Sequence, residues 1–187
     1  MKAAETKTKA ENQTLQAGAG RVEKDASNHR SEALADRIEE GAARLAEFVK
    51  GLSREQWLTP VSASDRRSVG VVVHHVATMY PIEIDLAKTI AAGQEVTEVS
   101  WDVVALLNAS HASENAEVTK QAALELLQKN SRAAADAVRS FTTEQLDQAA
   151  PLSLNSGAPV TAQFVIEDHA MRHSWHHLAQ IRKALEL

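Results

Sequence analysis

Apolar side chains recur every three to four residues along most of this chain, which is the spacing that buries one face of a helix. The first such stretch covers about residues 31–52, and others cover about 68–92, 101–113, 119–141 and 160–187. In the first stretch the apolar face consists of Leu34, Ile38, Leu45, Phe48, Val49 and Leu52. The pattern predicts five helices joined by short polar segments.

Two short motifs make the second half of the chain similar to the first. The sequences Ser-Arg-Glu-Gln (53–56) and Thr-Thr-Glu-Gln (142–145) have the pattern of a capping box, which begins a short helical turn. Each follows a long helix and precedes a proline-containing loop and a helix with histidines. The likeness is short, but it predicts two helical hairpins joined by a long crossover over residues 93–118 that contains an extra helix. Such hairpins pack as an all-α four-helix bundle.

The composition fits one helical domain and argues against several classes of function. Of 187 residues 44% are hydrophobic and 4% aromatic, with 7 Gly and 4 Pro. Residues 1–30 carry almost no large apolar side chains, so we expect a flexible N-terminal tail or extension before a domain over 31–187. The net charge is −5 and the basic residues are scattered, which indicates no nucleic-acid surface. Because the chain has neither a long apolar run nor a secretory signal, we expect no membrane span and a cytoplasmic location.

The last predicted helix contains four of the eight histidines within nine residues: His169, His173, His176 and His177. Side chains four residues apart on a helix lie one above the other, roughly 6 Å apart, so two imidazoles at this spacing can hold one metal ion. The helical phase places His177 inside the border of the apolar face and His173 beside it. His169 and His176 lie progressively further toward the polar face. The pair His173 and His177 is therefore the better candidate.

The second predicted helix offers a candidate third ligand. His75 lies on the edge of its apolar face, whereas His74 points almost opposite and is expected at the surface. Three neutral imidazoles from His75, His173 and His177 would leave a coordination position open, as in catalytic metal sites. A single border histidine is more often a hydrogen-bonded core or surface residue, so the prediction requires the two helices to be neighbours. His111, in the crossover helix, is expected to be structural or exposed.

Two carboxylates, Glu83 and Glu167, fall near the middle of apolar faces, where an unpaired charge is costly. For Glu83 we favour a simple explanation, either a polar stretch at the end of the bundle or an error in the assigned helical phase. For Glu167 that explanation and a role near the ligands both remain open. The candidate proton carriers are therefore His176, His169 and Glu167.

The two histidine segments resemble those of the DinB/YfiT-like family of metal-dependent enzymes. In that family the first ligand ends a W-[ST]-V-x-x-V-V-x-H pattern, which matches residues 67–75 and His75, except that Arg67 replaces the aromatic residue. The other ligands are the histidines of H-x-x-x-H before L-x-x-I, which match His173 and His177. The resemblance covers about residues 31–187 in helix order, but only these two segments are specific. The departure at Arg67 concerns loop packing or pocket shape and not the ligands.

The resemblance implies an up-down-down-up four-helix bundle, often dimeric, that binds a divalent metal ion, zinc or nickel. Some relatives resemble thiol S-transferases and thiol-dependent isomerases that use low-molecular-weight bacterial thiols, and many have no assigned reaction. With no cysteine in the chain, any thiol must be an external cosubstrate. We therefore expect a homodimeric metal-dependent S-transferase or hydrolase acting on a small molecule. The alternatives are a binding or stress-response protein in which the metal only stabilises the bundle, and a metal-free bundle.

Overall fold

The computed structural model describes residues 29–187, so nearly all of the expected N-terminal tail, residues 1–28, lies outside the described residues. The helical elements are a first helix over residues 29–50, α2 (Arg54–Leu58), α3 (Val69–Ala91), α4 (Trp101–Glu114), α5 (Lys120–Arg139), α6 (Thr143–Asp147), η1 (Ser153–Asn155), α7 (Ala162–Val165), the π-helical η2 (Ile166–Met171) and α8 (Arg172–Leu185). Two short antiparallel strands, β1 (Ala149–Pro151) and β2 (Pro159–Thr161), pair with Ala150 opposite Val160. Within residues 29–187 we find no helix with the length and apolar character needed to cross a membrane.

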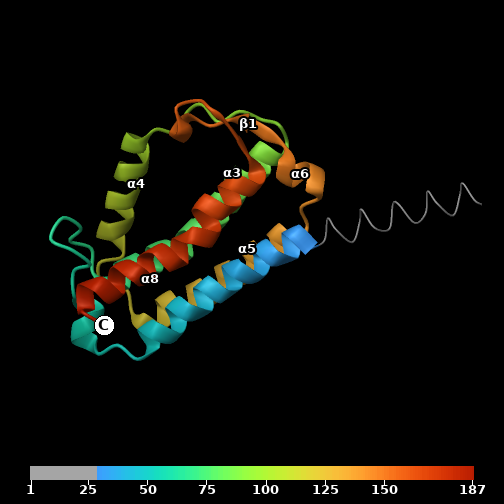
Figure 1. Cartoon of the computed structure of the whole chain (residues 1–187). Helices are drawn as coiled ribbons and strands as arrows, with labels where there is room; N and C mark the ends of the chain where they lie inside the picture. The colour runs from blue at the N-terminus through green and yellow to red at the C-terminus, as the bar shows by residue number, and fades with distance from the viewer. Residues whose placement is uncertain (1–28) are drawn as a thin grey trace, which may run out of the picture.

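Four long helical segments form the bundle: the first helix, α3, α5 and the continuous α7–η2–α8 segment (Figure 1). The helix α3 packs along α5, and it also contacts α7, η2 and α8. Tyr80 of α3 is fully buried, and its hydroxyl group lies 2.7 Å from the hydroxyl group of Ser174 in α8. The two histidine-bearing helices are therefore neighbours, as the predicted metal site requires.

Side-chain caps fix where the helices begin. Both predicted capping boxes are present, at Ser53 before α2 and at Thr142 before α6. Ser68 and Thr119 cap α3 and α5 by accepting backbone hydrogen bonds, as their positions before apolar stretches indicate. Gly93, just beyond the end of α3, has a φ of 71°, a conformation that favours glycine.

A proline interrupts the hydrogen bonds of α3 midway between the histidines and the end of the helix. Pro81 has no backbone N–H and leaves the carbonyl group of Ala77 without its usual helical donor. The side-chain amide of Asn130 in α5 donates a 2.9 Å hydrogen bond to that carbonyl oxygen. The contact between α3 and α5 therefore supplies the bond that the proline removes.

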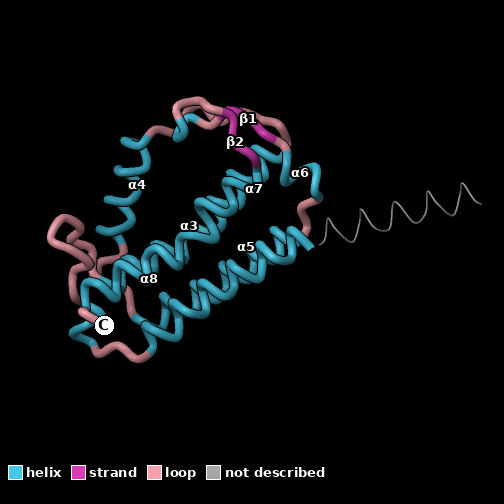
Figure 2. Tube along the Cα trace, viewed as in Figure 1, coloured by secondary structure: helices cyan, strands magenta, loops and turns pink. Residues whose placement is uncertain are grey.

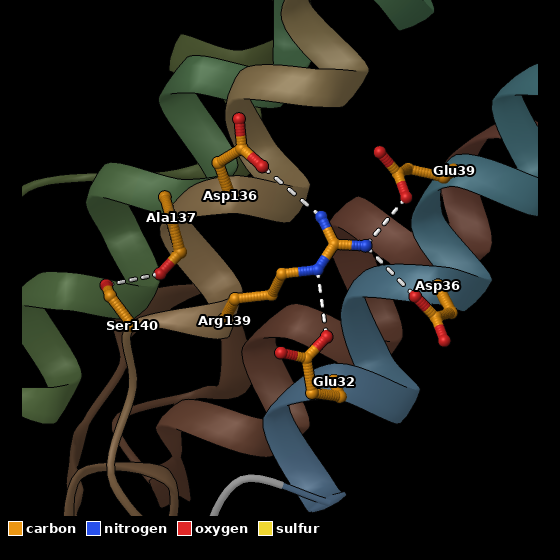
Figure 3. Close-up of polar contacts among 7 residues, drawn as sticks. All are labelled: Glu32, Asp36, Glu39, Asp136, Ala137, Arg139 and Ser140. Carbon is orange, nitrogen blue, oxygen red and sulfur yellow. Dashed lines mark hydrogen bonds and ion pairs between the residues drawn. The ribbon is translucent and has the colours of Figure 1, made fainter.

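Arg139, at the end of α5, joins this helix to the first helix (Figure 3). Its guanidinium group lies 2.9 Å from Glu32, 2.9 Å from Asp36 and 2.7 Å from Glu39, which follow one face of the first helix, and 3.3 Å from Asp136. Hydrogen bonds to Glu39 and Asp36 raise the pKa of Arg139, so the group stays charged. A network of this kind fixes the register of the two helices more firmly than one exposed pair would.

The C-terminal segment differs from the single helix expected over residues 160–187 (Figure 2). The strand β2 extends to Thr161, and η2 is π-helical, with more residues per turn than an α-helix. The π-helical turn changes the phase between α7 and α8, so one helical period cannot describe both. Phe164 and Trp175, which the single period assigned to the apolar face, are 39% and 38% exposed.

Candidate metal centre

Three histidines from two neighbouring helices converge on one point. His75 comes from α3, and His173 and His177 come from successive turns of α8. One ring nitrogen from each lies within 4.8 Å of the others. The ring centroid of His75 is 5.0 Å from that of His173 and 5.7 Å from that of His177. The structure thus brings together the three residues chosen from the sequence, and we call them the histidine triad.

Hydrogen bonds orient two rings of the triad. The Nδ1 atom of His173 lies 2.6 Å from Oε1 of Glu83, and Nδ1 of His177 lies 2.8 Å from Oε1 of Gln180. Carboxylate and amide oxygens accept hydrogen bonds, so in both rings Nδ1 carries the proton. The lone pair is then on Nε2, which is free to bind a metal ion.

Burial keeps two triad rings in the neutral form that binds metals. His75 and His177 are buried, and loss of hydration lowers the pKa of His75 to about 2 and that of His177 to about 3. The neighbouring imidazole of His173 lowers both pKa values further. Neutral imidazole is the ligating form, so the donor set fits a divalent metal ion at neutral pH.

Glu83 has a defined partner, so the simple explanation favoured for it was wrong. The side chain is only 5% exposed, and its Oε1 atom binds His173. Its Oε2 atom is buried and has no hydrogen-bond partner within residues 29–187. Glu167, in contrast, accepts a 2.9 Å hydrogen bond from Gln163 and is not among the described residues that line the cavity beside the triad.

The triad forms part of the wall of a cavity of about 650 Å³. The cavity lies between α3, α4, η2 and α8, with the segment around Leu152 and Leu154 at one end. His169 and His176, two of the candidate proton carriers, line it as well. Burial lowers the pKa of His176, and the nearby positive charge of Arg172 lowers it further.

Two histidines that the sequence did not assign to the site connect α3 to α4. Nδ1 of His74 lies 2.9 Å from Nε2 of His111, and the ring of His111 is centred 5.5 Å from that of His75. His111 also lines the cavity. The expected surface position of His74 is therefore corrected: its ring is half-buried, because His111, near the C-terminal end of α4, lies against it. The position of α4 depends on tertiary contacts, and no spacing in the sequence indicates it.

Arg67, where the chain departs from the family pattern, closes the loop before α3. Its Nε and Nη2 atoms donate to the carboxylate of Asp65 at 2.9 and 2.7 Å, and this contact lowers the pKa of Asp65. The backbone N–H of Val61 donates to the carbonyl oxygen of Arg67. The arginine thus forms part of the loop structure and leaves the triad intact.

Comparison with known proteins agrees with the fold. A solved structure of YfiT from Bacillus subtilis, described as a probable metal-dependent hydrolase with an unusual four-helix bundle topology, is similar to this chain with a TM-score of 0.68 and 19% identity. The match covers 84% of this chain and 87% of that one, and at this identity it shows a shared fold. No curated protein matches the sequence significantly. The family model of the DinB superfamily matches residues 37–181, and the chain belongs to this superfamily.

Proposed function

We propose that this protein is a metal-dependent enzyme that activates a nucleophile for attack on a small molecule. The observation that carries the proposal is the histidine triad, whose ligating nitrogens lie within 4.8 Å of one another at the wall of a 650 Å³ cavity. Three protein ligands leave coordination positions open, which is the pattern of catalytic sites and not of closed structural ones. Imidazole donors suit zinc and nickel, and we propose one of these ions. Such an ion acts as a Lewis acid that polarises a substrate and makes water or a thiol more nucleophilic at neutral pH.

The residues around the triad have separate tasks in this proposal. Glu83 holds the His173 ring in position through Nδ1, and Gln180 does the same for His177. His176 lies at the cavity wall, and burial lowers its pKa, which favours the neutral ring that can accept a proton from the nucleophile. His169 lines the same wall and is the second candidate for proton transfer.

The nucleophile decides between two reaction classes. With water the reaction is hydrolysis, and with an external thiol it is S-transfer, in which an S–C bond forms, the leaving group departs with its bonding electrons and the thiol proton passes to a base. The cavity of about 650 Å³ has the size of an ordinary small-molecule site, for which the range is roughly 300–1,000 Å³.

A reaction screen on untagged, metal-loaded protein tests the proposal. Activated esters and alkyl or aryl electrophiles are supplied with and without low-molecular-weight thiols, and product formation is measured by mass spectrometry. We expect turnover that disappears after chelation and in His177→Ala. A metal that raises the melting temperature but supports neither turnover nor the binding of a metal-directed inhibitor would favour the structural alternative.

A further inference from the structure

We infer that the substrate is an elongated, largely apolar and uncharged small molecule that lies along α4 with one polar reactive group at the histidine triad. This inference rests on the proposed function and names the substrate class of the same site. It depends on the length of the cavity, the character of its walls and the exposure of α4.

The cavity extends well beyond the metal centre. On α3 its lining runs from His75 to Leu86, which are eleven residues or about 16 Å apart at 1.5 Å per residue. On α4 the lining runs from Trp101 to Glu114, and within it Trp101 lies about 15 Å along the helix axis from His111, which is next to His75. A ligand bound at the triad therefore has a path of about 15 Å toward Trp101.

The helix α4 spans this space without filling it. None of its residues is buried, and Figure 1 shows it standing apart from α3 and α8. Its C-terminal end is held by the contact between His74 and His111, and the segment before it by the hydroxyl of Ser153, which donates to the carbonyl oxygen of Val99 at 2.6 Å. The apolar side chains between these two attachments are exposed beside the cavity. Exposed apolar surface around a cavity is typical of ligand sites.

The walls differ in character along the length of the cavity. The α3 and α4 walls are mainly apolar and include Met79, Ile82, Leu86, Val104 and Leu107. They also carry two carboxylates near the triad end, Glu83, which binds His173, and Glu114, which accepts a hydrogen bond from Ser110, and these disfavour an anionic ligand. The wall formed by η2 and α8 is polar, but its charges are balanced, because the carboxylate of Asp168 pairs with Arg172 at 3.4 Å. An uncharged ligand with one apolar side fits these walls better than an anion or a polyol does.

A series of straight-chain hydroxamates tests this inference, because each combines a metal-binding end with an apolar tail. Binding to the full-length, metal-loaded protein is measured by calorimetry, from acetohydroxamate upward and below micelle-forming concentrations. Each added methylene should tighten binding about fourfold, the value for transfer of one CH₂ from water, until the tail reaches Trp101. Tail binding should also shift the fluorescence of Trp101, and Trp101→Phe should remove that shift.

Two adjacent leucines of α4 provide a matched pair of variants. Leu107 lines the cavity and is 62% exposed, whereas Leu106 is 72% exposed and is not among the lining residues. Because both are exposed, neither Leu107→Ser nor Leu106→Ser should unfold the protein. We expect Leu107→Ser to weaken the longer hydroxamates at least threefold and to leave acetohydroxamate unchanged, and Leu106→Ser to change neither.

The outcomes separate this inference from the proposed function. If acetohydroxamate binds but chain length has no effect, or if both leucine variants behave alike, the substrate class is wrong and the metal centre stands. If Leu107→Ser changes the oligomeric state and not the affinity for long chains, α4 is an interface between copies and the inference is wrong. If the protein takes up no metal, the proposed function fails, and the inference fails with it.

Discussion

Replacing Glu83 by alanine should weaken metal binding without weakening the metal-free fold. The Glu83 carboxylate fixes the His173 ring through a 2.6 Å contact with Nδ1, which directs Nε2 toward the other two ligands. Removing a partner of this kind typically lowers metal affinity 10- to 100-fold, or about 1.4–2.7 kcal/mol. Glu83→Gln retains an acceptor oxygen but loses the charge, so its affinity should fall between those of the wild type and the alanine variant.

The stability of the metal-free protein should respond differently. Glu83 is buried and its Oε2 atom lacks a hydrogen-bond partner within residues 29–187, so removing the side chain relieves a desolvation cost while it breaks one hydrogen bond. We expect these effects to cancel to within about 1 kcal/mol in the free energy of unfolding.

The assay is competition for zinc or nickel against a chromophoric chelator at fixed pH and ionic strength, together with urea unfolding of the metal-free protein. Asp85→Ala is the control, because Asp85 is a carboxylate on the same helix whose side chain is 74% exposed. It should leave metal affinity unchanged. If Glu83→Ala binds metal within twofold of the wild type, Glu83 does not orient the ligand. If affinity and unfolding free energy fall together, its role is in folding.

Three further predictions concern the bundle. In the metal-free protein, His75 and His177 have pKa values of about 2 and 3, whereas the unfolded chain binds protons at both near pH 6.5. The free energy of unfolding should therefore be greatest above about pH 6.5 and fall toward pH 3, by up to about 1.4 kcal/mol per histidine for each pH unit. Urea midpoints that do not change over this range would contradict the burial of these two rings. Asn130→Ala removes the donor that compensates for Pro81 and should lower the free energy of unfolding in urea by about 1–2 kcal/mol. In a Pro81→Ala background, which restores the backbone donor, the same change should lower it by less. Equal losses in both backgrounds would refute this pairing. Arg139→Ala should destabilise the fold by about 1 kcal/mol at low salt and by less at 1 M salt, because the ion-pair network is partly exposed and salt screens it. An effect independent of salt would show that Arg139 acts through packing instead.

Local patterns were sufficient to predict the parts of the structure that depend on local physics. Ser53 and Thr142 begin short helices because a capping box involves only residues within one turn. The spacing of His173 and His177 fixes their relative position once the segment is helical, so the pattern alone was sufficient to predict their proximity. The four-helix bundle and the placement of His75 followed from the apolar faces.

The features that were missed depend on tertiary contacts or on an unusual helical period. Glu83 is acceptable in the core because it forms a hydrogen bond with His173, which lies 90 residues later in the chain. No local pattern encodes that pairing. The pairing of His74 with His111 depends on where both ends of α4 are attached. The π-helical η2 changes the phase between α7 and α8, which a constant 100° per residue cannot reproduce.

Metal analysis of the purified, untagged protein tests the central claim most directly. After loading with zinc or nickel and removal of excess ion, we expect about one divalent metal ion per chain by inductively coupled plasma mass spectrometry. His173→Ala and His177→Ala should each lose it while retaining the helical content of the wild type by circular dichroism. Wild-type protein that takes up neither ion, or a full metal content in both variants, would contradict a metal centre at the histidine triad.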